Sequence, residues 1–227
     1  MERMRKSKLI IAIILVITIL GVSLGFAAFS NNLTISSSAD VSLENSLRVY
    51  FSSSKNEQST IVGEDNIYLS ETYPGFTASI PVLDNSVETA PVMSNLKATF
   101  VRPGEAVTYT FYVHNASDYA IQLTDIIFGT KNCRAKEGTN QDLVNNACNE
   151  IDLSITVGED NAVTKTQNTS LDSAVVDHVL AAGAYETLSI VLSYERLTGG
   201  VDNSSVNGDF EVIFGDVKLT YSSSTTD

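Results

Sequence analysis

The sequence predicts an all-β fold: a two-sheet antiparallel sandwich, jelly-roll-like, preceded by one N-terminal hydrophobic helix. Three observations predict it. Apolar and polar residues alternate in many short segments, which is the period of half-buried strands. Turn-forming residues separate these segments at short intervals, as they do in sandwiches. Ser, Thr, Asn, Val and Ile are abundant, and this composition favours strands and turns over helices.

The first 28 residues have the layout of a secretory signal. Met1–Lys8 is basic, Leu9–Leu20 is apolar apart from Thr18, and Gly21–Ala28 is small and apolar. Basic residues before an apolar run keep that end cytoplasmic, so we expect residues 29–227 to be exported as a secreted or cell-surface β-sandwich. The segment is long enough to span a bilayer, so it is either a cleaved signal peptide or a membrane anchor. Membrane contact is expected through this segment alone.

Two cleavage points are open within this segment. An ordinary signal peptidase favours small residues at the last and third-last positions. Gly25 and Ala27 meet that requirement for a cut after Ala27. A cut between Ala28 and Phe29 places the bulky Phe26 in the third-last position, which suits an ordinary peptidase less well.

The exported part begins with a regular alternation over Phe29–Leu43. This stretch lacks proline and glycine, so every backbone N–H can join a ladder. After cleavage it could complete the sheet of a neighbouring subunit by strand addition; the alternative is that it is the first strand of its own sandwich. The candidate residues for strand exchange are Leu33, Ile35, Ala39, Val41 and Leu43.

The next part of the chain predicts short strands and loops. Three of the four prolines fall in Glu71–Ser94, which favours edge strands and loops there. The stretch Val62–Asn66 recurs as Val157–Asn161, and both copies are expected to be hairpin turns, with calcium held by their carboxylates as the alternative. The strands expected before the second copy are Leu47–Phe51, Ile67–Ser70, Leu96–Val101, Ala106–His114, Tyr119–Phe128 and Ile151–Val157.

The last strand carries a break in its alternation. Phe210, Val212 and Phe214 share one parity, whereas Val217 and the apolar residues after it share the other. A β-bulge at Gly215-Asp216 would keep both sets on one face. Upstream, a strand is expected over 188–194, and a short helix is one possibility for Asn168–Asp177.

The two cysteines, Cys133 and Cys148, bound a polar stretch over Lys131–Ala147. Export places them in a non-reducing space, and an even number suits a disulfide. The bridge would close a loop of about 16 residues and stabilise the fold by roughly 3 kcal/mol in the chain-entropy model.

Charge and motif content exclude several function classes. The net charge is −13, and four of the 14 basic residues stand in the first eight positions. The exported part is therefore strongly acidic, which excludes nucleic acid as a partner. The chain has two histidines, neither of them in a zinc-binding motif, and no nucleophile elbow, phosphate loop or dinucleotide fingerprint. We expect no enzymatic activity, catalytic residue, cofactor or metal, and we expect His114, beside a turn, to be solvated.

Two stretches resemble the TasA/camelysin family of bacterial surface and biofilm-matrix fibre proteins. The first is Gly25-Phe26-Ala27-Ala28-Phe29-Ser30-Asn31, followed by the alternating segment. The second is Val101-Arg102-Pro103-Gly104-Glu105-Ala106-Val107, with the turn motif Pro103, Gly104 and Glu105, a strand, and Asn115 after it. The resemblance implies cleavage between Ala28 and Phe29 by a SipW-type signal peptidase. It also implies fibres joined through an inserted N-terminal strand.

The leading hypothesis is an exported structural protein, a subunit of a cell-surface or biofilm-matrix fibre. Its partners would be the SipW-type peptidase and copies of itself or related surface proteins. The alternative is a monomeric, membrane-tethered adhesion or binding module.

Overall fold

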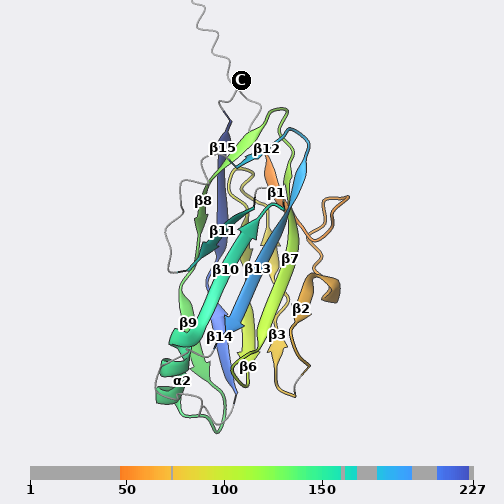
Figure 1. The fold of residues 1–227 in the computed structure, drawn as a ribbon. Helices are drawn as coiled ribbons and strands as arrows, with labels where there is room; N and C mark the ends of the chain where they lie inside the picture. Colours follow the sequence, from red (N-terminus) through yellow and green to blue (C-terminus); the bar gives the residue numbers. More distant parts are fainter. Residues whose placement is uncertain (1–46, 73, 160–161, 168–177, 196–208, 225–227) are drawn as a thin grey trace, which may run out of the picture. The chain divides into compact units, whose positions relative to one another are not determined.

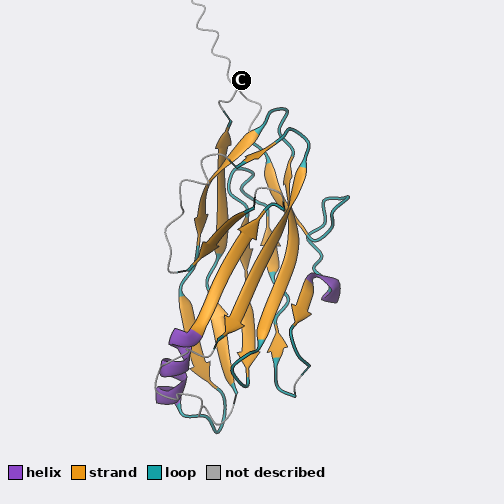
Figure 2. Cartoon of the chain, in the orientation of Figure 1, coloured by secondary structure: helices purple, strands orange, loops and turns teal. Residues whose placement is uncertain are grey.

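The computed structural model describes residues 47–72, 74–159, 162–167, 178–195 and 209–224, and these form an all-β antiparallel sandwich (Figure 1; Figure 2). The predicted fold class is confirmed. The expected N-terminal helix, the Ala28–Phe29 cleavage point, the Phe29–Leu43 segment and Asn168–Asp177 lie outside the described residues. No helix among the described residues is long and apolar enough to cross a membrane.

The first layer of the sandwich is one six-stranded sheet with the order β1-β7-β13-β10-β11, and β2 pairs with β7 beside β1. Its long strands alternate buried and less buried residues, as the sequence predicts. The strands are β1 (Val49–Ser52), β2 (Ile67–Leu69), β7 (Ala106–Asn115), β10 (Ile151–Val157), β11 (Val163–Thr166) and β13 (Tyr185–Tyr194).

The second layer consists of two shorter sheets, and the chain passes repeatedly from one of them into the other. Their orders are β12-β8-β15-β5-β4 and β3-β6-β14-β9. The chain passes from one sheet to the other at four places, from β3 to β4, β5 to β6, β8 to β9 and β14 to β15, so this layer is broken across its middle. Its strands are β3 (Thr77–Ala78), β4 (Val82–Asp84), β5 (Val92–Ser94), β6 (Lys97–Phe100), β8 (Ile121–Ile127), β9 (Lys131–Ala135), β12 (Val179–Leu180), β14 (Phe210–Phe214) and β15 (Val217–Ser223).

Two glycines meet at this break. A Cβ atom placed on Gly129 would lie 2.3 Å from the backbone of Gly215, closer than any side chain can approach. The Gly215 N–H donates to the carbonyl of Thr130 at 3.0 Å. The sequence-based expectation of a bulge at Gly215-Asp216 is therefore wrong, because β14 and β15 belong to different sheets. The register shift in β15 lies instead between Thr220 and Tyr221.

The expected bulge was to keep the apolar residues of both strands on one face. The break between the two sheets of the second layer has the same effect. All six alternating apolar residues of the last two strands are buried in one core. The chain leaves one sheet at Gly215 and enters the other, and the alternation of buried residues shifts by one position there. The six residues are Phe210, Val212, Phe214, Val217, Leu219 and Tyr221. The rings of Phe100, Tyr194 and Phe210 pack against one another within the same core.

The stretch between the cysteines is more regular than predicted. It contains β9 and the helix α2 (Gln141–Ala147), whose first turn is capped by the side chain of Asn140. Val144 and Ala147 of the helix are fully buried, so the helix packs on the core. Two single 3-10 turns complete the described secondary structure, η1 (Glu64–Asn66) and η2 (Cys148–Glu150).

Candidate functional site

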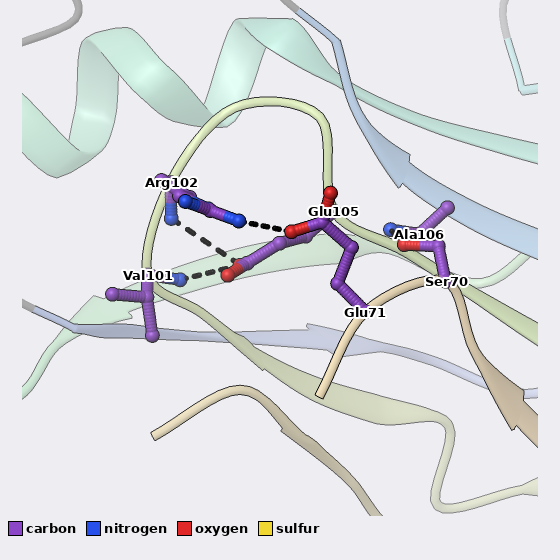
Figure 3. A network of polar contacts seen from close by, with 6 residues as sticks. All are labelled: Ser70, Glu71, Val101, Arg102, Glu105 and Ala106. Atoms are coloured by element: carbon purple, nitrogen blue, oxygen red, sulfur yellow. Dashed lines mark hydrogen bonds and ion pairs between the residues drawn. The ribbon is translucent and has the colours of Figure 1, made fainter. Parts of the chain in front are cut away.

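The Pro-Gly-Glu turn joins β6 to β7 and is closed by a buried carboxylate (Figure 3). The N–H groups of Val101 and Arg102 donate to Oε2 of Glu105 at 2.7 and 3.2 Å. Gly104 has φ of 99°, a left-handed value that favours glycine. Arg102 forms an ion pair with Glu71, which follows β2. The turn motif identified from the sequence therefore has a structural role: its hydrogen bonds hold the turn closed and fix where β7 begins.

Glu105 is 1 % exposed, and its Oε1 atom has no hydrogen-bond partner among the described residues. Burial raises the pKa of this carboxyl above its ordinary value of 4.5, and the two backbone N–H donors oppose that shift without cancelling it. The folded state therefore holds a proton on Glu105 more readily than the unfolded chain does. The contribution of the protonated Glu105 carboxyl to stability is complete below pH 4.5 and is lost as the pH rises through the folded-state pKa.

Glu105→Gln should remove this pH dependence. The amide keeps an oxygen to accept the two backbone bonds but carries no charge, so it mimics the protonated acid. Urea unfolding between pH 4 and 8 is expected to show wild-type stability falling relative to the variant as the pH rises. Glu57→Gln, which removes an exposed carboxylate outside the turn, is the control for the loss of one charge. Parallel curves for wild type and Glu105→Gln would contradict the assignment.

The predicted disulfide is present and anchors α2 to the second layer. Cys133 of β9 is bonded to Cys148, directly after the helix, with their Cα atoms 5.9 Å apart. At the other end of the helix, Gln141 lies along the outer edge of β9. Its Oε1 accepts from the N–H of Ala135 at 2.8 Å, and its Nε2 donates to the carbonyl of Cys133 at 3.1 Å. The amide thus takes the place of a neighbouring strand.

Two further amide side chains close edges of the first sheet in the same way. Asn85 accepts from the N–H of Phe51 at 2.8 Å and donates to the carbonyl of the same residue at 2.9 Å, on the outer edge of β1. Asn66 fills the gap between β1 and β2 by donating to the carbonyls of Thr110 and Ser53. Such capping blocks edge-to-edge pairing.

The repeated five-residue stretch therefore has a structural role in its first copy. Asn66 makes the bonds described above, and it also accepts from the N–H of Gly63. In the second copy Gly158 has φ of 86°, and Glu159 accepts from the hydroxyl of Thr187 at 2.7 Å; Asp160 and Asn161 lie outside the described residues. No group of three or more His, Cys, Asp or Glu residues is placed for a metal within the described part of the chain.

The opposite side of the sandwich, between β8 and β11, is closed differently. β12 covers only Ile121 and Gln122 of β8. Beyond Leu123, whose N–H donates to His178, the β8 edge is met by Lys165 of β11, which donates to the carbonyl of Ile126 and pairs with Asp125. On this side of the sandwich, a flexible lysine side chain contacts the strand edge, whereas amide side chains cap the other edges described above.

Lys131 of β9 makes the matching contact in the other direction. Its ammonium donates to the carbonyl of Ile151, at the start of β10, at 2.7 Å. Burial lowers the pKa of this lysine. Each layer therefore sends one lysine to a backbone carbonyl of the other at this side of the sandwich.

Both histidines are buried, which the sequence did not predict. His114 is 9 % exposed, against the expectation of a solvated residue, because the loop after β1 covers it; its ring stacks on Tyr50 and its Nε2 lies 3.3 Å from the carbonyl of Ser54. Burial lowers its pKa. The Nε2 of His178 lies 2.5 Å from Glu186, whose other oxygen accepts from the hydroxyl of Tyr221.

This His178–Glu186–Tyr221 cluster joins the two layers, since His178 precedes β12, Glu186 lies in β13 and Tyr221 in β15. Tyr221 lies 35 residues from Glu186, so no local motif could reveal the whole cluster. Burial raises the pKa of Tyr221, and the neighbouring carboxylate raises it further.

Comparison with protein-family models gives no match, and neither does a search of curated proteins.

Proposed function

We propose that this chain is an exported structural surface protein, a subunit of a cell-surface or biofilm-matrix fibre that assembles by β-strand addition. The observation that carries the proposal is the contrast between the sheet edges. Amide side chains close β1, the gap before β2 and the outer edge of β9. Among the described residues, the β8 edge beyond Leu123 is met by the flexible side chain of Lys165.

A strand added at β8 would find suitable surroundings. Ile126 is fully buried and Val163 of β11 is nearly so, and both belong to the apolar core at this side of the sandwich. Displacing the Lys165 ammonium frees the carbonyl of Ile126 as an acceptor. The incoming strand supplies backbone bonds, and its alternate side chains set the register.

The donor in this proposal is Phe29–Leu43. A SipW-type peptidase cutting between Ala28 and Phe29 would release it from the membrane, so that assembly follows export. N-terminal sequencing of the extracellular protein checks this order of events, and Phe29 is the expected first residue. The second candidate function is a monomeric adhesion or binding module held to the membrane by an uncleaved residue 1–28 segment.

Deleting Phe29–Asp40 from the mature protein should abolish polymerisation while leaving the sandwich folded. Size-exclusion chromatography and electron microscopy provide the measurement, and circular dichroism verifies the fold. A matched pair of variants isolates the mechanism: Ile35→Asp places a charge on the parity expected to be buried, and Ser36→Asp places it on the other. We expect only Ile35→Asp to block filaments. Normal filaments from the deleted chain would rule out strand exchange and favour the monomeric module.

A further inference from the structure

One face of the first sheet is turned away from the core and carries rows of hydroxyl groups. Every second residue of β7, β13 and β10 is buried, so the residues between them point outward. The register aligns Thr110, Ser189, Thr156 and Thr164 in one row across four strands. We call this surface the hydroxyl face; its other hydroxyl residues are Thr108, Thr187, Ser193, Ser154 and Thr166.

Aromatic rings gather at one end of the hydroxyl face. Tyr185 is 41 % exposed, and its ring centroid lies 6.1 Å from that of Tyr112 and 5.5 Å from that of His114. Tyr50 stacks on the far side of the same cluster, 4.9 Å from His114. At the edge of the face, Tyr68 of β2 is 66 % exposed and stands opposite Thr108. Aromatic rings therefore lie at one end and along one edge of the hydroxyl face.

The hydroxyl face is nearly free of charge although the chain carries −13. Among the outward-pointing residues of the described strands in this sheet, Asp152 is the one acidic residue and none is Lys or Arg. Two charges contact the aromatic end of the face: Lys55 lies over the Tyr185 ring, and Glu159 accepts from the hydroxyl of Thr187. β7, β13 and β10 lie side by side in Figure 1. The overall acidity repels anionic ligands, and this face offers a cation almost nothing to pair with.

We propose that the hydroxyl face binds an uncharged polysaccharide. A pyranose ring has an apolar face of C–H groups, which packs on an exposed tyrosine ring, and a rim of hydroxyl groups. Ser and Thr hydroxyls both donate and accept hydrogen bonds, so they satisfy sugar hydroxyls directly or through water. Within a row, side chains on neighbouring strands are about 4.8 Å apart, so a row repeats these contacts along a polymer. The proposal uses a sheet face, not an edge, so it is independent of strand addition.

Native gel electrophoresis of the purified full chain, in non-ionic detergent, tests the proposal. The gels contain a neutral β-glucan, a neutral mannan or the anionic polygalacturonate. We expect a neutral polymer to retard the chain and polygalacturonate to leave its mobility unchanged. Tyr185→Ala should weaken the retardation about tenfold, and Ser189→Glu, which puts a charge in the middle row, should abolish it. Tyr185→Phe keeps the ring and Ile127→Ala alters an exposed side chain of the second layer, so both should bind like the wild type.

Three results would overturn the proposal. The first is unchanged mobility in both neutral polymers. The second is retardation that Tyr185→Ala and Ser189→Glu leave intact in chains whose circular dichroism matches the wild type. The third is sedimentation, without polysaccharide, of an oligomer that Ser189→Glu dissociates, because the face would then bind a second copy of the chain.

Discussion

Gly129→Ala is expected to prevent stable folding of the sandwich. The added Cβ would lie 2.3 Å from both the Cα and the carbonyl carbon of Gly215, and 2.6 Å from the amide nitrogen of Asp216. All three are backbone atoms of the chain between β14 and β15, so no side-chain rotation can relieve the overlap. Separating the two chains would disturb the core residues on both sides of the break. We expect a loss of about 4 kcal/mol or more, a large part of a typical domain's stability.

Gly63→Ala is the matched control for this prediction. A Cβ at Gly63 meets nothing within 4 Å, so the same chemical change costs no contact there. We expect its urea unfolding midpoint to stay within the small range of surface substitutions. Equal midpoints for Gly129→Ala and Gly63→Ala would show that the crossing at Gly215 is not a close contact.

The strands that the sequence predicted well are those with one buried face. Ala106–His114 was expected and Ala106–Asn115 is observed, because Val107, Tyr109 and Phe111 fill every second position. Ile151–Val157 has the bounds predicted. Alternation is a local property and its period is fixed by the backbone, so one sequence is enough to recognise it.

The features that escaped prediction depend on residues far apart in the chain. Nothing local to Asn85 indicates that its amide will face Phe51, 34 residues earlier. Charge content likewise gave no indication that Glu186 would meet both His178 and Tyr221. The break in the second layer was visible as a slip in phase at Gly215, but its partner Gly129 lies far earlier in the chain, between β8 and β9. Contacts of this kind follow from the topology, which alternation alone does not determine.

The disulfide differs from these contacts because cysteine chemistry restricts the choice of partner. With two cysteines in the sequence, one intramolecular pairing is possible. The surroundings of the pair were still not predicted: Cys133 lies within β9, and Cys148 follows a helix that the core already holds through Val144 and Ala147. The bridge and the packing therefore restrain the same segment independently.

Replacing both cysteines by serine is expected to lower the free energy of unfolding by roughly 3 kcal/mol, because the unfolded chain regains the freedom of a closed loop with a sequence separation of 15. Urea unfolding without reductant measures this loss. A dithiol reductant should bring the wild type to the stability of the variant, since both then lack the bridge.

Hydrogen exchange distinguishes this effect from loss of the helix. Gln141 accepts from the N–H of Ala135 without help from the disulfide, and Val144 remains buried beneath the helix. The Ala135 amide should therefore exchange in the double variant only as fast as the lower global stability allows. Much faster exchange at Ala135 than at core amides of β9 and β14 would mean that the disulfide, and not the packing of Val144 and Ala147, holds α2 on the edge of β9.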